Sequence, residues 1–256
     1  QNGGLVKGVP TTTGWACCAG PGLFLGSSGS YWGAGASTAE YDLNGGILLV
    51  SSIYNLNGVN DFGYLLPPNG SAVFRFNGGV LRGTQSDSID LGVIKDGTTN
   101  LMGNLSHAYV GLGGAKIDVA MFSCGINQAL EHDPALGATP DGGLHAMSTG
   151  GPGTLALYKL STFTGPLAID TGVTVNLGYA GDQRVASVSI GGVNQGTGTF
   201  GVGHLNPGGV FTGTGTVTVT PANPPLVWTP SGSGFVLAWD NASAMLLQST
   251  NVMGPW

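Results

Sequence analysis

The stretch from residue 132 to residue 145 gathers side chains that could do chemistry. It contains two histidines and two aspartates that lie on one predicted loop, His132, Asp133, Asp141 and His145. Imidazole nitrogens and carboxylate oxygens can bind a metal ion, but the spacing of these four residues matches no zinc or calcium motif. Two prolines in the same stretch limit regular strand pairing. We therefore expect a projecting loop and no metal site.

Asp87 and Asp90, three residues apart in the sequence, are a candidate pair of catalytic carboxylates. Hydrolysis of a polysaccharide needs two carboxyl groups that work on the same bond. In a strand, Asp87 and Ile89 would share one face and Asp90 would point to the other, so the pattern favours turn-forming aspartates. The chain also has no G-x-S-x-G, P-loop or dinucleotide-binding motif. We predict no catalytic residues, no cofactor and no enzyme activity.

Short strands must position these side chains. Between Gly150 and Val219, runs of three to six residues alternate apolar and small polar side chains, and Gly, Pro, Asn or Asp separates the runs. A period of two between turn residues indicates half-buried β-strands. Glycine makes up 48 of the 256 residues and weakens helices. The sequence therefore predicts an all-β protein.

An internal repeat indicates how the strands are arranged. The segment Tyr41–Leu48 (YDLNGGIL) recurs as Phe74–Leu81 (FRFNGGVL) with a spacing of 33 residues, and a weaker copy places Gly113 35 residues after Gly78. Fixed-period similarity is typical of repeat architectures. Asn-Gly supplies tight corners, and stacked Asn side chains can form a hydrogen-bonded ladder. We predict a right-handed parallel β-helix (β-solenoid), in preference to an antiparallel sandwich or a propeller.

Composition divides the chain into four predicted segments. They are an irregular N-terminal arm or cap at 1–38, the β-helix at 39–219, a proline-rich linker at 220–225 and a small C-terminal β module at 226–256. About thirty residues cannot bury a core of their own. We therefore expect the C-terminal module to dock on the β-helix or on another chain.

Charge excludes several classes of partner. The chain has thirteen acidic and seven basic residues, with a formal net charge of −6, and the basic residues are scattered along the sequence. Nucleic acids and anionic membranes need clustered Lys and Arg, so neither is an expected partner. No apolar run approaches the ~20 residues that span a bilayer. Because the chain begins at Gln1, we expect a secreted protein whose signal peptide has been removed; an arbitrary chain boundary is the alternative.

Three cysteines are candidates for a disulfide. Cys17 and Cys18 are adjacent, which does not fit zinc ligand spacing, and Cys124 lies far along the chain. In a secreted protein, one of the adjacent pair could bridge to Cys124. The alternative is three buried thiols, since free cysteine packs well in a core.

Several segments resemble a known family. Gly153–Leu157 (GTLAL), followed by Phe163–Leu167 (FTGPL), is similar to the core of autotransporter-associated β-strand repeat proteins. Ser187–Gly201 and Phe211–Val219 resemble the final repeat of such proteins, and the tail resembles the short β module that follows the repeats in secreted bacterial versions. The resemblance covers roughly residues 40–256 and implies a parallel β-helix outside the cell. Relatives are often much longer, and their C-terminal module continues past the final tryptophan.

We therefore predict an extracellular structural protein of the bacterial surface. Its chains would assemble head to tail into a fibre or layer by strand donation between the N-terminal arm and the C-terminal module of a neighbour. The candidate interface residues are aromatic or aliphatic: Trp15, Phe24, Trp32, Phe235, Leu237, Leu247 and Trp256. The partner would then be the protein itself.

An adhesin or glycan-binding module is the alternative prediction. Aromatic rings such as those of Tyr31, Trp32 or Tyr179 would stack on the sugars of a surface glycan. A polysaccharide-degrading enzyme is a third prediction. It is disfavoured because the carboxylates that hydrolysis would need are dispersed along the chain.

Overall fold

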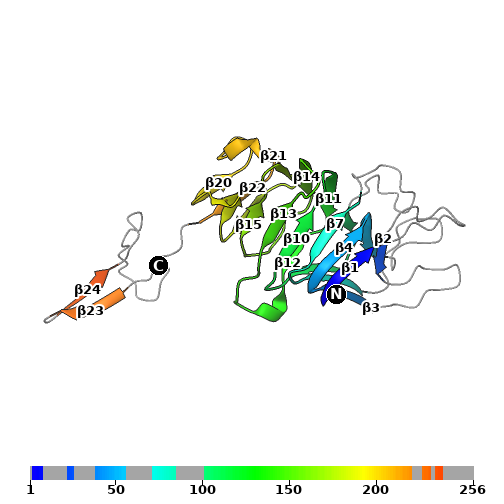
Figure 1. Ribbon diagram of the computed structural model, residues 1–256. Coiled ribbons are helices and arrows are strands. Elements are labelled where there is room, and N and C mark those ends of the chain that lie inside the picture. Colours follow the sequence, from blue (N-terminus) through cyan, green and yellow to red (C-terminus); the bar gives the residue numbers. More distant parts are fainter. Residues whose placement is uncertain are drawn as a thin grey trace, which may run out of the picture. The chain divides into compact units, whose positions relative to one another are not determined.

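The computed structural model describes residues 2–7, 22–25, 38–55, 71–84, 101–220, 227–231 and 234–238 (Figure 1). Side chains are described in Leu23, Leu25 and the segments 38–55, 71–84 and 101–220. The chain divides into two units, Gln1–Thr220 and Pro221–Trp256. Described secondary structure is almost all β, with two short 3-10 helices, η2 (Pro134–Leu136) and η3 (Pro207–Gly209). The all-β prediction is therefore confirmed.

Three sheets contain most strands of the first unit. The eight-stranded sheet has the order β1 (Asn2–Lys7), β4 (Gly45–Val50), β7 (Val80–Gly83), β10 (Ala115–Asp118), β13 (Leu144–Met147), β15 (Leu167–Ile169), β18 (Val188–Ile190), β19 (Val193–Asn194). The seven-stranded sheet has the order β2 (Gly22–Leu25), β5 (Ser52–Asn55), β8 (Met102–Gly103), β11 (Ser123–Asn127), β14 (Gly153–Leu157), β16 (Val173–Leu177), β21 (Phe211–Gly213). The four-stranded sheet has the order β12 (Leu130–His132), β9 (His107–Val110), β6 (Ser71–Phe76), β3 (Thr38–Leu43).

Two smaller sheets complete the described strands. The first unit has a three-stranded sheet of β17 (Asp182–Val185), β22 (Thr216–Val219) and β20 (Gly198–Phe200). The second unit has an antiparallel pair of β23 (Val227–Ser231) and β24 (Gly234–Ala238).

Consecutive strands lie in different sheets, except for the antiparallel pairs β18–β19 and β23–β24, and each parallel pair joins strands that are not consecutive in the chain. Strand β6 lies beside β3, and β7 lies beside β4, so that Tyr41 faces Phe74 and Leu48 faces Leu81 in register. The predicted repeat is therefore confirmed as a register of paired strands. The next repeat is one residue longer than predicted, because Asp118 lies 36 residues after Arg82, its neighbour across the sheet.

The prediction of a single right-handed parallel β-helix is wrong. The strands divide among separate, mostly parallel sheets of unequal size, and two pairs in the first unit, β18–β19 and β20–β22, are antiparallel. The prediction failed because the Asn-Gly-Gly pattern specifies only one corner in two or three repeats. Nothing in that pattern fixes the path of the chain after β16, where the spacing between paired strands changes.

The prediction of an irregular N-terminal arm is also wrong in part. Within residues 1–38, β1 pairs in parallel with β4, and β2 pairs in parallel with β5. These Gly-rich segments form strands because they pair with the edges of β4 and β5. Such tertiary pairing overrides a weak local β-propensity. Trp15 and Trp32 lie outside the described residues.

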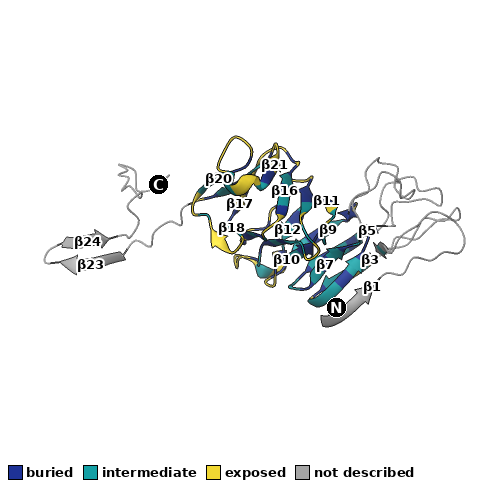
Figure 2. Ribbon diagram, turned by 45° about the horizontal axis from the view of Figure 1, so that its top comes forward, coloured by how far each residue is buried: buried dark blue, intermediate teal, exposed yellow. Residues whose placement is uncertain are grey.

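The core lies between the inner faces of the sheets. Along β6, the side chains of Ala72, Phe74 and Phe76 are fully buried, whereas the residues between them are only partly buried. This alternation follows from the period of two in a strand. Phe74 stacks on Tyr41 of the neighbouring strand and contacts Phe76 edge-to-face, with ring centroids 5.4 and 4.7 Å apart. Figure 2 shows buried residues along the strands and exposed residues concentrated in the turns.

Candidate functional site

The outer face of the four-stranded sheet gathers charged side chains around Arg75. The Arg75 guanidinium donates to Glu40 Oε1 at 3.0 Å and to the carboxylate of Asp133, and it lies 3.5 Å from Asp42 Oδ1. It also lies over the ring of Tyr109, 5.0 Å from the ring centre. Burial opposes the charge of Arg75, but hydrogen bonds to Asp133 and Glu40 outweigh it and raise the pKa of Arg75 above its ordinary value.

Strand register brings this cluster together. Asp42, Arg75, Tyr109 and Glu131 are direct neighbours across β3, β6, β9 and β12. All four lie on the same face, because paired residues of neighbouring strands point to the same side of a sheet. Residues far apart in the sequence therefore form one row.

A second group on this face is aromatic. The rings of His107 and Tyr109 stack with their centres 4.9 Å apart and their planes 9° from parallel. His107 Nδ1 lies 3.0 Å from Glu131 Oε2. Burial, followed by the nearby charge of Glu131, raises the pKa of Tyr109. The face thus combines rings, carboxylates and one guanidinium.

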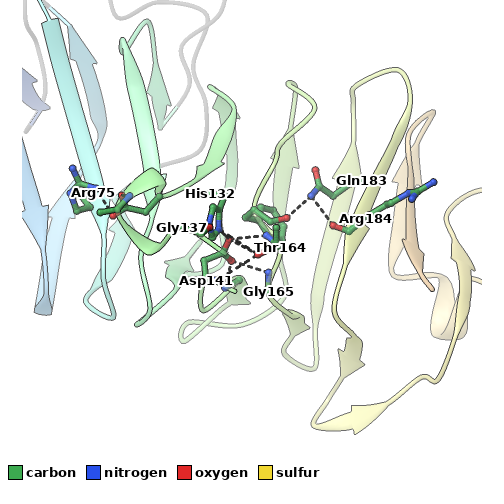
Figure 3. A network of polar contacts seen from close by, with 12 residues as sticks. Arg75, His132, Gly137, Asp141, Thr164, Gly165, Gln183 and Arg184 are labelled. Carbon is green, nitrogen blue, oxygen red and sulfur yellow. Dashed lines mark hydrogen bonds and ion pairs between the residues drawn. The ribbon is translucent and has the colours of Figure 1, made fainter. Parts of the chain in front are cut away.

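Asp141 is the centre of a second polar network, at the end of the loop between β12 and β13 (Figure 3). Its buried carboxylate accepts hydrogen bonds from the backbone N–H groups of Gly143 (2.9 Å), Thr164 (2.7 Å) and Gly165 (2.9 Å). It also lies 2.7 Å from His132 Nδ1. Burial alone would raise the pKa of Asp141, but these hydrogen bonds outweigh it and lower the pKa below its ordinary value.

The geometry of this network does not suit nucleophilic catalysis. The Thr164 hydroxyl lies 3.4 Å from His132 Nδ1, the same nitrogen that faces Asp141. A catalytic triad needs the nucleophile and the carboxylate on opposite ring nitrogens. The other nitrogen, Nε2, faces the carbonyl oxygen of Gly137 at 3.1 Å. The network therefore joins the loop to its neighbours and leaves no activated hydroxyl.

The four residues considered as metal ligands separate into three groups. His132 contacts Asp141, Asp133 contacts Arg75, and His145 Nε2 lies 2.8 Å from Asp170 Oδ1. Within the described segments, no group of three or more His, Cys, Asp or Glu side chains is arranged to hold a metal ion. Asp87 and Asp90 lie outside these segments.

Asp118 on β10 is a further buried carboxylate, which sequence reasoning did not single out. It accepts hydrogen bonds from Arg82 Nε at 2.8 Å, from the Ala120 N–H at 2.9 Å and from both the N–H and the hydroxyl of Thr149. Burial would raise its pKa, but the hydrogen bonds from Thr149, followed by those from Ala120 and Arg82, lower it. The carboxylate therefore joins two adjacent corners of the eight-stranded sheet.

The predicted interface residues have no described side chains. Trp15, Trp32, Leu247 and Trp256 lie outside the described residues. Phe24 lies in β2, and Phe235 and Leu237 lie in β24, and the structure describes only the backbone of these three residues. Their role in an interface remains a prediction.

The disulfide also remains a prediction. Cys124 is buried in β11, and Cys17 and Cys18 lie outside the described residues. Tyr179, which was considered as a platform for sugars, is buried, and its hydroxyl donates to the Thr216 carbonyl oxygen at 3.0 Å. Its ring is therefore not available for stacking on a ligand.

The sequence contained a signal for part of the charged row. The 33-residue repeat aligns Asp42 with Arg75, so an ion pair between neighbouring strands could have been predicted from the repeat alone. No comparable signal links Arg75 to Asp133, which lie 58 residues apart. That contact depends on the number of residues in each turn between β6 and β12.

No family model, curated protein or solved structure matches the chain. The resemblance to autotransporter-associated repeats therefore remains a hypothesis that rests on the quoted segments. In the described part of the chain, no helix is long and apolar enough to cross a bilayer.

Proposed function

We propose that the protein is an extracellular structural protein whose copies associate end to end. The observation that carries this proposal is the position of β3 at the edge of the described four-stranded sheet. Strand β3 pairs with β6 at all six of its residues, and no described strand lies on its other side. An extended edge of this kind is a template for a strand from another chain. The low content of charged residues and the abundance of glycine also support a repetitive protein outside the cell.

Hydrogen bonds show which backbone groups of β3 face away from β6. The Leu43 carbonyl oxygen accepts from the N–H groups of Asn77 at 3.0 Å and Gly79 at 3.1 Å, so the peptide groups of Leu43 face β6. In a parallel strand, alternate residues direct their N–H and C=O groups to opposite sides. The N–H group of Glu40 therefore faces away from β6, toward a prospective partner.

The opposite ends of the sheets carry exposed apolar side chains. Val193 lies in β19, the last strand of the eight-stranded sheet, and Val202 and Leu205 follow β20, the last strand of the three-stranded sheet. These side chains are 64%, 58% and 50% exposed, respectively. Burying them against a second copy would be favourable, at about 25 cal/mol for each Å² of apolar surface removed from water.

Two different ends meeting head to tail would give an open polymer. A contact between unlike surfaces that does not close into a ring extends indefinitely. Glu40 and Asp42 would limit pairing to partners that tolerate carboxylates, because charges on an edge strand discourage indiscriminate association. Strand donation involving the C-terminal hairpin β23–β24 is a finer version of the same proposal, and it rests on the sequence prediction.

A proline substitution at the open edge tests the proposal. Glu40→Pro removes the outward N–H, and proline is tolerated on edge strands. Glu40→Ala is the matched control, because it removes the same carboxylate and retains the N–H. We expect the wild type and Glu40→Ala to form polymers by sedimentation velocity and negative-stain microscopy, and Glu40→Pro to remain monomeric with unchanged circular dichroism. A wild-type protein that stays monomeric at high concentration, or a polymer unaffected by Glu40→Pro, would contradict the proposal.

We propose glycan binding as a second function, because stacked rings and hydrogen-bonding groups lie side by side on the outer face of the four-stranded sheet. His107 and Tyr109 supply the rings, and Glu131 supplies a carboxylate acceptor. Aromatic rings and carboxylates are suited to the apolar faces and hydroxyl groups of sugars. Binding on a glycan array should be lost with Tyr109→Ala and retained with Tyr158→Ala, which removes an exposed tyrosine that lies outside the four-stranded sheet. No binding by the wild type, or equal loss in both variants, would contradict this proposal.

A further inference from the structure

His132 lies where β12 ends and the exposed loop to β13 begins, and both nitrogens of its ring face oxygen atoms (Figure 3). Nδ1 lies 2.7 Å from Asp141 Oδ2, and Nε2 lies 3.1 Å from the carbonyl oxygen of Gly137. The ring therefore spans the loop, with Gly137 on one side and Asp141 on the other.

The chemistry of the two oxygens determines the protonation of the ring. A carbonyl oxygen only accepts hydrogen bonds, so Nε2 must carry a proton. The Asp141 carboxylate already accepts from the N–H groups of Gly143, Thr164 and Gly165, which stabilise its ionised form. An ionised carboxylate also only accepts, so Nδ1 must carry a proton as well.

We infer that His132 is held as an imidazolium and acts as a proton-dependent latch on the loop Asp133–Asp141. A neutral imidazole has one N–H and can satisfy only one of the two acceptors. The bond to Asp141 is charge-assisted and is the stronger of the two. Loss of the proton from Nε2 therefore breaks the hydrogen bond to Gly137. The lone pair of Nε2 then faces the carbonyl oxygen of Gly137 and repels it.

The contacts at the two ends of the loop do not require this proton. Asp133 is held by Arg75 and accepts from the Ala135 N–H at 3.0 Å, and Asp141 is held by backbone N–H groups. Between these ends, the loop is largely exposed. The His132–Gly137 bond joins the middle of the loop to the end of β12, so its loss loosens the middle and leaves the ends fixed.

The groups around His132 favour its charged form. Asp141 from the loop is the main one, and Asp133, the residue that follows His132, adds a second negative charge. Thr164, from the segment after β14, contributes a neutral hydroxyl. Arg75 on β6 is the nearby cation, and it is paired with Asp133. The hydrogen bond to Asp141 is the largest effect and raises the pKa of His132, with burial opposing it and the Gly137 carbonyl adding to it.

The sign of the pH dependence follows from this direction. Because the pKa of His132 is higher in the folded state than its ordinary value of about 6.5, the latch is fully closed below about pH 6.5. Its contribution is lost as the pH rises through the folded-state pKa. We expect the loop to be held below about pH 6.5 and to loosen as the pH rises through the folded-state pKa of His132.

Two measurements on the full chain test the latch. Nitrogen-15 NMR of the imidazole rings should show His132 doubly protonated at pH 6.5, with a titration midpoint above that of the same residue in urea. Hydrogen exchange of the loop amides of Gly137 and Thr139, corrected for the intrinsic effect of pH, should lose protection by roughly 3- to 10-fold as His132 deprotonates, which corresponds to one hydrogen bond of ordinary net strength.

Matched variants separate the latch from general effects of pH. His132→Gln can donate a hydrogen bond but does not titrate, so its loop protection should be independent of pH. His145→Gln changes a histidine that contacts Asp170 instead, and it should retain the wild-type pH dependence. A singly protonated His132 at pH 6.5, or the same pH-dependent loss of protection in His132→Gln, would overturn the inference.

Discussion

The side-chain amide of Asn77 donates a 3.0 Å hydrogen bond to the side-chain oxygen of Asn44, 33 residues earlier in the chain. The side-chain oxygen of Asn77 in turn accepts from the backbone N–H of Gly113 at 2.9 Å. Three successive corners are thereby joined by side chains of the Asn-Gly-Gly repeat. The ladder predicted from that repeat is confirmed, and Asn77 is its central member.

Truncation of Asn77 should destabilise the first unit. Asn77→Ala removes both bonds of the ladder and leaves the Gly113 N–H without this acceptor. Each bond contributes about 0.5–1.5 kcal/mol, so we expect a loss of about 1–2 kcal/mol in the free energy of unfolding, measured in urea. Thr212→Ala, at an exposed position in β21, is the control and should change stability by less than about 0.5 kcal/mol. Equal values for the two variants would show that the ladder contributes nothing.

Loss of Arg75 should leave a buried carboxylate unpaired. Arg75→Met retains most of the side-chain volume and removes the guanidinium from Asp133, whose side chain is only 7% exposed. Breaking a fully buried pair costs about 3–5 kcal/mol. Because the Arg75 side chain is 26% exposed, we expect about 2 kcal/mol, measured by urea unfolding.

The exposed Arg184 supplies the control for this prediction. Arg184→Met should change stability by less than about 0.5 kcal/mol. The double variant Arg75→Met, Asp133→Asn should recover part of the loss, because it removes the unpaired charge. A loss of stability in Arg75→Met no larger than in Arg184→Met would contradict the prediction.

Asp118 should contribute to the loss of stability in acid. Its pKa is lower in the folded state than its ordinary value of about 3.9, so its contribution is fully present above about pH 4 and declines as the pH falls through the folded-state pKa. Asp118→Asn should flatten the decline in unfolding free energy between about pH 4 and pH 2. The double variant with Asp141→Asn should flatten it further, because Asp141 has the same direction of shift. An unchanged pH profile in both variants would count against these assignments.

Gly143 should tolerate no side chain. Its φ is +71°, and an added Cβ would overlap the carbonyl oxygen of Pro166. Gly143→Ala combines this overlap with left-handed strain and should cost about 3 kcal/mol or more. Gly137 has φ +58° and ψ −119°, with nothing within 4 Å of an added Cβ, so Gly137→Ala meets backbone strain alone and should cost about 1–3 kcal/mol. Thermal unfolding of the pair separates overlap from backbone strain, and equal losses would contradict the geometry.

Local patterns predicted the strands and part of their register. The alternation in Val173–Leu177 identifies β16 without any knowledge of its neighbours, and the Asn-Gly-Gly repeat aligns β4 with β7. Both signals depend on residues within one strand or one corner. The strand content and the Asn44–Asn77 contact could therefore be derived from the sequence.

Features that depend on the length of several corners could not be derived. The contact between Arg75 and Asp133 crosses β9 and requires the correct length of every intervening turn. The same dependence on corner length explains why the predicted β-helix and the predicted irregular arm were wrong. The sequence contains no signal for the antiparallel pairing of β22 with β20 or for the pairing of β1 with β4. The sequence marks Asp141 as a possible metal ligand, but its role depends on backbone N–H groups, which no side-chain motif reveals.

The order of strands within the sheets affects how the chain can fold. In the described part of the first unit, only β18 and β19 are both consecutive in the chain and paired with each other. Every other pair, such as β1 with β4, must wait for at least one intervening strand and its turns. A contact between residues far apart in the sequence requires the chain to lose loop-closure entropy before the contact stabilises it, and this loss slows folding. A chain emerging from its N-terminus would therefore remain unpaired until β4 had followed β1. Every later described strand of the first unit except β17 and β20 would then find a partner strand that precedes it in the chain.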